Sequence, residues 1–438
     1  MSGMVEEDLE ARIVRLVSSL AGVEAGAIDP AAHFRRDLGM TSFDTLNLRE
    51  GLERAFGIFI GDEDVPRLES VASVVALVRE RKGGPSGASV TREEAPDSTG
   101  SSSLEPTGER VRPFEIGMPH TGRNNLGETP LLRELGHERW QHMSAVTGVP
   151  SRDVVDADGV RIYPTFFYVD LAFPDERPMA GFGENDGLTI VSTLRRFGLS
   201  ILDGEHYLFP AGWSRERMLP PPSRRRALEE GVPVVRLCNS FVRQWDGAGW
   251  LRQSRPADPR FERIREMVEP PDAQEEVARA RERGTFEDPP EGWLEVTQGP
   301  ASCDYEIVPD RDLNGAGLLY FANYPLFLDI AERKILGALD VPLDEDVLDR
   351  RTTVRRRSAY FANATASDRL RISLRAFVWD PRTSDHPDPE GAPLRMLLQH
   401  RMERHSDGRL MMISTVRKAF MGVTLGRTGW LERWPGRA

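Results

Sequence analysis

A break in composition between residues 83 and 110 constrains the fold of this chain more than any other feature. Gly, Ser, Pro, Thr and Glu dominate the stretch, and no apolar period continues through it. Segments of this composition bury no core and behave as flexible linkers. The 438-residue chain is also too long for one compact core. We therefore predict separate parts before and after a linker over 83–110, which serves as a swinging tether or as a plain spacer.

Residues 1–82 carry the periodicity of three short helices. Apolar residues recur at helical spacing over 5–20, a second helix is predicted over 42–56, and a third over 71–78. These segments predict an all-α bundle.

A serine, Ser42, stands where the second predicted helix begins. Unpaired backbone amides and the positive end of the helix dipole favour an anion there, so this serine is well placed to carry a phosphodiester. The acidic residues Asp44, Glu50 and Glu53 follow on the exposed face and are predicted to meet basic patches on partners. The alternative is that Ser42 is only an N-cap.

The segment from Asp37 to Val71 resembles bacterial acyl carrier proteins. The matching residues are Asp37-Leu38-Gly39, Ser42, Asp44, Leu46, Leu52, Glu53, Phe56, Ile60 and Asp62-Glu63. The chain departs from the pattern at Thr41, where the family usually has aspartate. The resemblance implies an acyl carrier domain with a covalent 4′-phosphopantetheine on Ser42, and a phosphopantetheinyl transferase as a partner.

From residue 111 onward the chain is predicted to be α+β with a divergent internal duplication. Asn124-Asn125-Leu126-Gly127 and Asn314-Gly315-Ala316-Gly317 each precede an apolar helix with proline in its first turn, Pro130 and Pro325. Strand-like runs follow at 161–171, 204–209 and 232–244, and again at 356–361, 369–379, 394–403 and 410–419. We predict a first half over 111–250, a connector over 251–298 with one helix at 273–283, and a second half over 299–425. Two sheets, each wrapped around a helix, would make a double hot dog.

The glycine-rich run that leads to Asp329 resembles the entry to the central helix of hot-dog thioesterases and dehydratases. In that setting, backbone amides stabilise negative charge on a thioester carbonyl oxygen, and glycines allow close approach of the backbone. The resemblance implies roles for Asn314, Gly315, Gly317 and Asn323. The alternative is a turn that caps a buried helix.

Residues 111–425 as a whole resemble the bifunctional acyltransferase/decarboxylase family of the leinamycin pathway, whose members are double hot dogs. The resemblance rests on Gly117-Met118-Pro119-His120, residues 159–166, Phe197-Gly198, Asn239-Ser240-Phe241, residues 314–329 and residues 360–364. It implies decarboxylation of methylmalonyl-CoA (or malonyl-CoA) and delivery of propionyl (or acetyl) to an acyl carrier. Polyketide synthase components or other carrier-dependent enzymes are then expected partners. The family is described as using a tyrosine, and Tyr163 best matches its position. The resemblance implies that Tyr163 is an acyl acceptor or a hydrogen-bond donor; the alternative is that it is only an aromatic residue of a strand.

Decarboxylation requires an apolar pocket that desolvates the carboxylate. The aromatic side chains predicted to line it are Phe166, Phe167, Phe321 and Tyr324. The polar side chains predicted to contact the substrate are His120, Thr165, Asn314, Asn323 and Asn363. His120 is the predicted proton source for the enolate, unless it is a surface or core residue. Basic clusters at 224–226, 350–351 and 355–357 are candidates for binding CoA phosphates or the carrier helix, or are solvated faces.

Two other functions remain open. A hot-dog thioesterase needs a carboxylate near a helix start, and Asp329 or Glu128 is available. A dehydratase needs His with Asp or Glu, and Asp329 and Glu332 lie in the appropriate helix. A non-catalytic module that only presents acyl chains is the other alternative. The acyl substituent, its stereochemistry, the product, the oligomeric state and the enzyme served by the arm stay open.

Charge and cysteine content exclude several classes. The net charge of −12 argues against nucleic acid or an anionic membrane as a partner. Two cysteines, Cys238 and Cys303, have no metal-type spacing, so we expect no metal and a reducing compartment. No signal-peptide core and no apolar run of about 18 residues occurs. We expect a soluble cytoplasmic enzyme.

Overall fold

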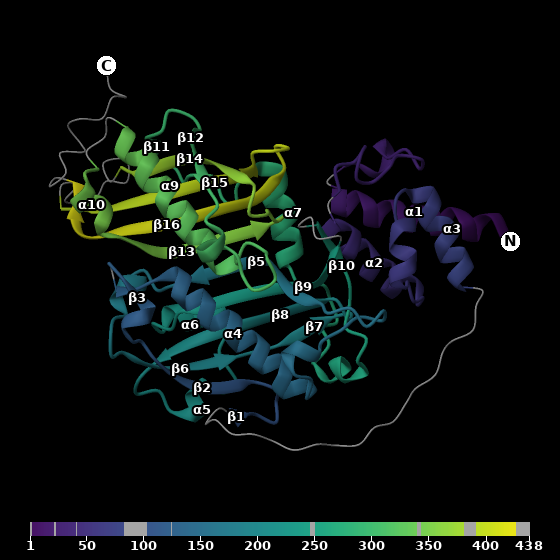
Figure 1. Ribbon diagram of the computed structural model, residues 1–438, viewed down its shortest axis with the longest axis horizontal. Coiled ribbons are helices and arrows are strands. Elements are labelled where there is room, and N and C mark those ends of the chain that lie inside the picture. Colours follow the sequence, from purple (N-terminus) through teal and green to yellow (C-terminus); the bar gives the residue numbers. More distant parts are fainter. Residues whose placement is uncertain are drawn as a thin grey trace.

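A computed structural model describes residues 2–21, 23–40, 42–82, 103–123, 125–245, 250–339, 343–380 and 391–425. Figure 1 shows a small group of N-terminal helices, in purple, beside a much larger domain built on a broad sheet. The sheet carries its two long helices on one face.

The N-terminal part is a bundle of three helices, α1 (Ser2–Ala21), α2 (Ser42–Phe56) and α3 (Val71–Lys82), with short 3-10 turns between them. Apolar side chains spaced by one helical turn point inward and form its core: Ile13, Val17, Leu48, Leu52, Val74 and Val78 are all buried. The three predicted helices are confirmed, and α2 begins at Ser42 as predicted.

The large domain contains a 14-stranded sheet among the described residues, and every pairing in it is antiparallel. Its strands are β1 (Ser103–Leu104), β2 (Arg110–Glu115), β5 (Tyr163–Ala172), β6 (Gly187–Ser192), β7 (Arg195–Phe197), β8 (Ile201–Pro210), β9 (Val234–Trp245), β10 (Trp250–Gln253), β11 (Trp293–Glu295), β12 (Ala301–Glu306), β13 (Arg351–Tyr360), β14 (Arg369–Trp379), β15 (Pro393–Arg404) and β16 (Leu410–Thr424). A separate two-stranded ribbon joins β3 (Thr121–Gly122) and β4 (Asn125–Leu126).

The two halves of this domain have the same topology. Outward from the centre, the first half runs β5-β9-β8-β6-β2 and the second runs β13-β16-β15-β14, with β12 paired to β14. Of the five strands just named in each half, one precedes the long helix and four follow it; these helices are α4 (Glu128–Thr147) and α9 (Tyr324–Ala338). The predicted duplication is therefore confirmed, and two helix-cradling sheets side by side are the double hot-dog arrangement.

The central pair β5–β13 joins the halves into one sheet, with Ala359 opposite Tyr168 and Arg355 opposite Ala172. α4 crosses the first half and α9 the second (Figure 1). Side chains of both helices share one core with the sheet, including Leu131 and Leu135 of α4 and Phe327 of α9. Five shorter helices lie in the connections: α5 (Arg215–Met218), α6 (Arg224–Glu229), α7 (Ala273–Arg283), α8 (Pro309–Asp312) and α10 (Glu345–Asp349).

The sheet extends beyond its predicted limits. The predicted linker over 83–110 includes β1 and the first residue of β2, while 83–102 lie outside the described residues. The predicted connector over 251–298 contributes most of β10 and all of β11, together with α7 at its predicted bounds. Strands of two to six residues such as β1, β6 and β11 are too short to show a period, and they form because a neighbouring strand pairs with them.

Candidate active site

A pocket of about 330 Å³ lies between the two halves, within the ~300–1,000 Å³ range of small-molecule sites. The start of β5 and the residues after β13 form two of its walls, and α4 and the segment before α9 form the others. Its lining residues are Gly136, His137, Trp140, Tyr163, Pro164, Thr165, Phe166, Phe167, Ser240, Val242, Leu251, Gln253, Asn314, Leu318, Leu319, Tyr320, Phe321, Tyr324, Tyr360, Phe361, Ala362, Asn363, Arg404 and Arg409. We call it the aromatic pocket.

Aromatic rings from both halves pack together along this pocket. The rings of Phe166 and Phe321 stack with centroids 3.8 Å apart, and Tyr324 meets Tyr360 edge to face at 5.0 Å. Burial raises the pKa of Tyr324 and of Tyr360 far above the usual range, so both phenols stay protonated at neutral pH. They are therefore neutral hydrogen-bond donors in an apolar setting.

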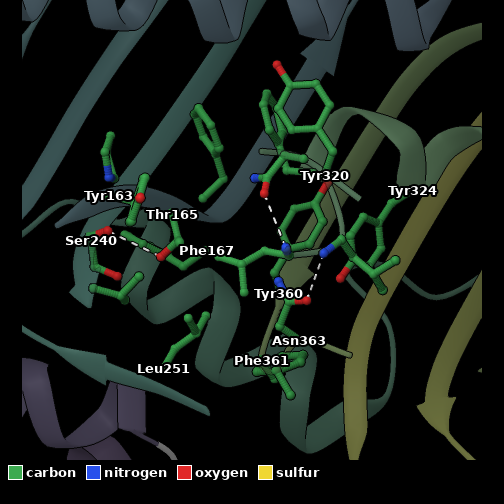
Figure 2. Close-up of a pocket in the computed structure, with 18 of the residues that line it drawn as sticks. Tyr163, Thr165, Phe167, Ser240, Leu251, Tyr320, Tyr324, Tyr360, Phe361 and Asn363 are labelled. Carbon is green, nitrogen blue, oxygen red and sulfur yellow. Dashed lines mark hydrogen bonds between the residues drawn. The ribbon is translucent and has the colours of Figure 1, made fainter. Parts of the chain in front are cut away.

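Polar groups occupy the opposite wall and the rim. Figure 2 shows Tyr163, Thr165 and Ser240 across the pocket from Tyr320, Tyr324 and Tyr360. The Thr165 hydroxyl donates to the Ser240 carbonyl at 3.2 Å.

Two asparagines shape the loop that precedes α9. The side-chain oxygen of Asn363 accepts from the Leu319 amide at 3.0 Å, and that of Asn314 accepts from the amides of Ala316 and Leu318 at 2.9 and 3.2 Å. These bonds hold the loop against the pocket.

Most of the predicted site residues line this one pocket. From the predicted set, the structure brings together Tyr163, Thr165, Phe166, Phe167, Asn314, Phe321, Tyr324 and Asn363. Tyr163 is half-buried, and the Arg161 guanidinium lies 4.9 Å from its ring centroid.

The two glycines lie elsewhere than predicted. Gly315 and Gly317 form a turn between Leu313 and Leu319, which bridge to each other, and neither lines the pocket. A 3-10 turn, Phe321–Asn323, separates this loop from α9, which begins at Tyr324. The Asn314 side chain closes this loop on itself before the helix starts, so the two glycines belong to the turn. Gly317 has φ +68°, a left-handed conformation that glycine adopts without strain.

Asn323 and His120 also lie outside the aromatic pocket. Asn323 is buried, donates to the Arg311 carbonyl at 3.0 Å and accepts from Arg133 at 2.6 Å, so it anchors the start of α9. The His120 ring accepts from the Gly117 amide at 2.9 Å and packs edge-on against Phe114. The prediction that His120 reprotonates a substrate here is not supported, because its ring belongs to a turn elsewhere.

His137 was not predicted to belong to the pocket. It lies on α4 as an exposed residue and lines the pocket beside Trp140. No local pattern identifies it, since the other walls come from β5, from the loop before α9 and from the residues after β13, all outside α4.

A second pocket, of about 180 Å³, occupies the equivalent place at the start of α4. We call it the charged pocket, and Glu128, Asp329 and Lys418 are among its lining residues. The Arg356 Nε lies 2.6 Å from a Glu128 oxygen, and the Lys418 Nζ lies 2.6 Å from both Asp329 and Glu332. The carboxylates considered for hydrolysis and dehydration are thus held in ion pairs, away from the aromatic pocket.

Glu332 also has a histidine neighbour that the sequence did not reveal. His400 Nε2 lies 3.1 Å from it, and both side chains are buried. Burial lowers the pKa of His400. Although burial opposes ionisation of Glu332, Lys418, His400 and Arg351 hold the pKa of that carboxyl well below its usual range.

The arginine clusters considered for carrier docking pair within their own domain. Arg224 and Arg355 both contact Asp170, at 2.6 and 2.9 Å, and Arg357 contacts Glu287 at 2.5 Å. Burial opposes ionisation of Asp170, but these two guanidiniums keep its pKa far below the usual range.

The carrier face meets two other arginines. Arg281 of α7 contacts Asp44 at 2.8 Å, and Arg255 contacts Glu53 at 3.1 Å. Asp44 and Glu53 thus pair with arginines of their own chain. Their contacts with partner enzymes stay a prediction, and the side chain of Glu50 lies outside the described set.

Comparison with known proteins identifies the N-terminal part. Residues 11–78 match the family model described as the phosphopantetheine attachment site. The helical bundle is therefore a carrier domain, a class that holds phosphopantetheine on a serine. The chain joins this carrier domain to a double hot-dog domain.

Several solved structures are similar to the chain. A putative oleoyl thioesterase from Lactobacillus plantarum is 11% identical, with a TM-score of 0.44, over 74% of this chain and 99% of that one. An acyl-ACP thioesterase from Bacteroides thetaiotaomicron is 10% identical, with a TM-score of 0.40, over 71% and 98%. The 12:0-ACP thioesterase from Umbellularia californica is 9% identical, with a TM-score of 0.39, over 71% and 94%.

Within the described ranges, every helix is too short or too polar to cross a membrane.

Proposed function

We propose that the chain decarboxylates a malonyl-type thioester in the aromatic pocket and passes the remaining acyl group to a thiol carried on Ser42. The proposed substrate is methylmalonyl-CoA (or malonyl-CoA), and the product is a propionyl (or acetyl) thioester. One observation carries the proposal. The described residues that line this pocket are aromatic, aliphatic, neutral polar or basic, and none is Asp or Glu.

This lining suits loss of a carboxylate. The bond between the α-carbon and the carboxylate breaks, its electron pair moves toward the thioester carbonyl oxygen, and carbon dioxide leaves. An apolar wall raises the free energy of the substrate carboxylate by removing its hydration. Neutral donors aimed at the oxygen stabilise the charge that develops there. In this proposal Tyr324 and Tyr360 supply the donors, while the Thr165 hydroxyl donates to the Ser240 carbonyl and holds the facing wall.

The α-carbon of the resulting enolate must then take up a proton. His137 is the imidazole that lines the pocket, so we assign it this role in place of His120. Tyr163 lies on the opposite wall and acts as a further donor to the carbonyl oxygen or as a transient acyl acceptor.

Phosphopantetheine, when bound, supplies a flexible arm that ends in a thiol. The residues present fit this group: α2 begins at Ser42, and Arg281 contacts the chain on both sides of it, at Gly39 and Asp44. Transfer forms a bond between the arm sulfur and the acyl carbon and breaks the bond to CoA sulfur, which leaves with the thiol proton. A phosphopantetheinyl transferase must act first, and polyketide synthase components are the proposed recipients of the acyl group.

The test is one incubation of the full chain, converted to the phosphopantetheinyl form, with methylmalonyl-CoA. Mass spectrometry of the peptide that contains Ser42 should show a propionyl thioester, and Ser42→Ala should abolish it. Free propionate or methylmalonate with released CoA would indicate hydrolysis instead. Unchanged methylmalonyl-CoA would favour a module that only presents acyl chains.

The geometry gives less support to hydrolysis or dehydration. Both reactions need a carboxylate beside the substrate, and Glu128, Asp329 and Glu332 are ion-paired at the charged pocket.

A further inference from the structure

Two arginines of the double hot-dog domain hold the chain's own carrier domain. Arg255 follows β10, contacts both oxygens of Glu53 at 3.1 and 3.4 Å, and lies 3.7 Å from the centroid of the Phe59 ring. Arg281 donates to Asp44 at 2.8 Å and to the Gly39 carbonyl at 2.5 Å. The second pair of contacts brackets Ser42, because Gly39 lies before it and Asp44 lies after it.

The same two arginines lie next to the rim of the aromatic pocket. The Arg281 guanidinium is 5.8 Å from the centroid of Phe361, which lines the pocket. Arg255 follows β10, whose residues Leu251 and Gln253 also line it. α2 contacts β10, and Figure 2 shows the purple carrier ribbon on the side of the pocket where Leu251 lies. The beginning of α2 therefore faces the entrance of this pocket.

Positive charge collects at that entrance. Arg404 and Arg409 line the pocket. Arg404 donates to the Asn363 carbonyl at 2.9 Å and pairs with Asp407 at 2.6 Å. Burial lowers the pKa of Arg409, and the neighbouring cations Arg404, Arg35 and Arg281 lower it further. Arg281, beside Phe361, adds a third guanidinium at this rim. A phosphodiester is the anion that such a group of guanidiniums binds well.

We infer that Arg255 and Arg281 dock the chain's own carrier domain, so that the arm of Ser42 enters the aromatic pocket past Phe361. In the docked state its phosphodiester lies beside Arg281, Arg404 and Arg409. The inference rests on the proposed function for its purpose, because the docked arm is then the acceptor of the acyl group. It also means that the carrier domain serves the catalytic domain of its own chain.

A designed disulfide tests docking without any turnover. Asp44→Cys combined with Arg281→Cys should form an intramolecular bond under mild oxidation, while the Arg255–Glu53 pair remains to hold the domains together. The matched control combines Asp44→Cys with Arg279→Cys, since Arg279 lies on the same helix, pairs with Glu275 and has a side chain 61% exposed. Oxidation at least several-fold faster for the first pair supports docking. Equal rates for the two pairs overturn it.

The phosphodiester site is tested by comparing the unmodified chain with the phosphopantetheinyl form in the same oxidation. The modified chain, with the thiol of its arm blocked, should cross-link faster because Arg404 and Arg409 remain in both forms, and Arg409→Gln should remove that difference. Equal rates for the two forms would overturn the phosphodiester site.

A charge swap then links docking to chemistry. Arg255→Glu with Arg281→Glu should slow acylation of the arm at least tenfold, and adding Glu53→Arg with Asp44→Arg should restore most of the rate. Failure of the swap to restore it overturns the assigned pairs. A chain that cross-links as expected but yields no acyl group would refute the proposed reaction and leave docking intact.

Discussion

The ion pair between Arg356 and Glu128 offers a direct test of how the charged pocket is built. Arg356 is 1% exposed and Glu128 8%, and Arg356 Nε lies 2.6 Å from the Glu128 carboxylate, with a second contact from Arg356 Nη2 at 3.2 Å. At 2.6 Å and an effective dielectric constant of about 20, Coulomb's law gives an attraction of roughly 6 kcal/mol. That figure is an upper bound, because both groups also lose hydration on burial.

Arg356→Met should therefore destabilise the double hot-dog domain by about 3–5 kcal/mol, since it leaves Glu128 buried without its cation. Glu128→Gln combined with Arg356→Met removes both charges and keeps the amide able to bond Thr353, which now donates to Glu128. We expect the double variant to recover all but about 1–2 kcal/mol, because removing a buried pair together costs far less than breaking it. Asp329 keeps its contact with Lys418 in both variants.

Tryptophan fluorescence during urea unfolding measures this in the full chain. All eight tryptophans lie at position 140 or later, so the signal does not report on the carrier domain. The midpoint gives the change in unfolding free energy when the slope is unchanged. A shift below about 1 kcal/mol for Arg356→Met, or a double variant as unstable as the single one, would refute the reasoning. The acylation rate of the double variant, measured per folded molecule, should be unchanged. A large loss of that rate would indicate that Glu128 takes part in the reaction.

Three further predictions concern the pocket and the buried histidines. Tyr324→Phe should lower the decarboxylation rate by roughly 10²–10³ with little change in KM, because one donor to the developing charge is lost; Tyr207→Phe, whose hydroxyl bonds Glu205, is the control and should retain the rate. Gly136→Ala should raise KM, since its new Cβ would lie 2.9 Å from the Phe321 ring and push that ring into the pocket; Gly337→Ala, with open space around it, should not. Burial lowers the pKa of His142 to about 4, so the unfolded chain binds more protons between about pH 6.5 and 4 and the unfolding free energy falls as pH drops through that window. His206 and His400 shift in the same direction; urea midpoints at several pH values should show the loss, and His142→Gln should reduce its slope.

The sequence predicted best those elements whose signal is local. Helix α2 and helix α7 have their predicted bounds, and β14 spans the predicted 369–379, because each carries its own apolar period and end signals. Of the aromatics that line the pocket, Tyr163, Phe166, Phe167, Phe321 and Tyr324 were also predicted, because they lie in recognisable motifs, whereas Trp140 and Tyr320 were not. Short strands and ion-pair partners were not predicted: β7 exists through its pairing with β8, and Arg281 meets Asp44 from 237 positions away. Gly315 and Gly317 were predicted to lie at the site, but they form a turn that the Asn314 side chain closes, and the motif alone does not specify that hydrogen bond.

The duplication also explains why only one of two equivalent pockets suits the proposed reaction. Because β5 and β13 are antiparallel, the start of β5 and the end of β13 meet at one end of the central pair, where the aromatic pocket lies. The start of β13 lies at the opposite end, beside the charged pocket. A carrier docked through Arg255 and Arg281 faces the first end. The second pocket lies away from the docked carrier, so ion pairs that stabilise the fold can fill it at no cost to the proposed reaction. Docking on one side of a symmetric fold would thus account for both the absence of carboxylates from the described lining of one pocket and the ion pairs of the other.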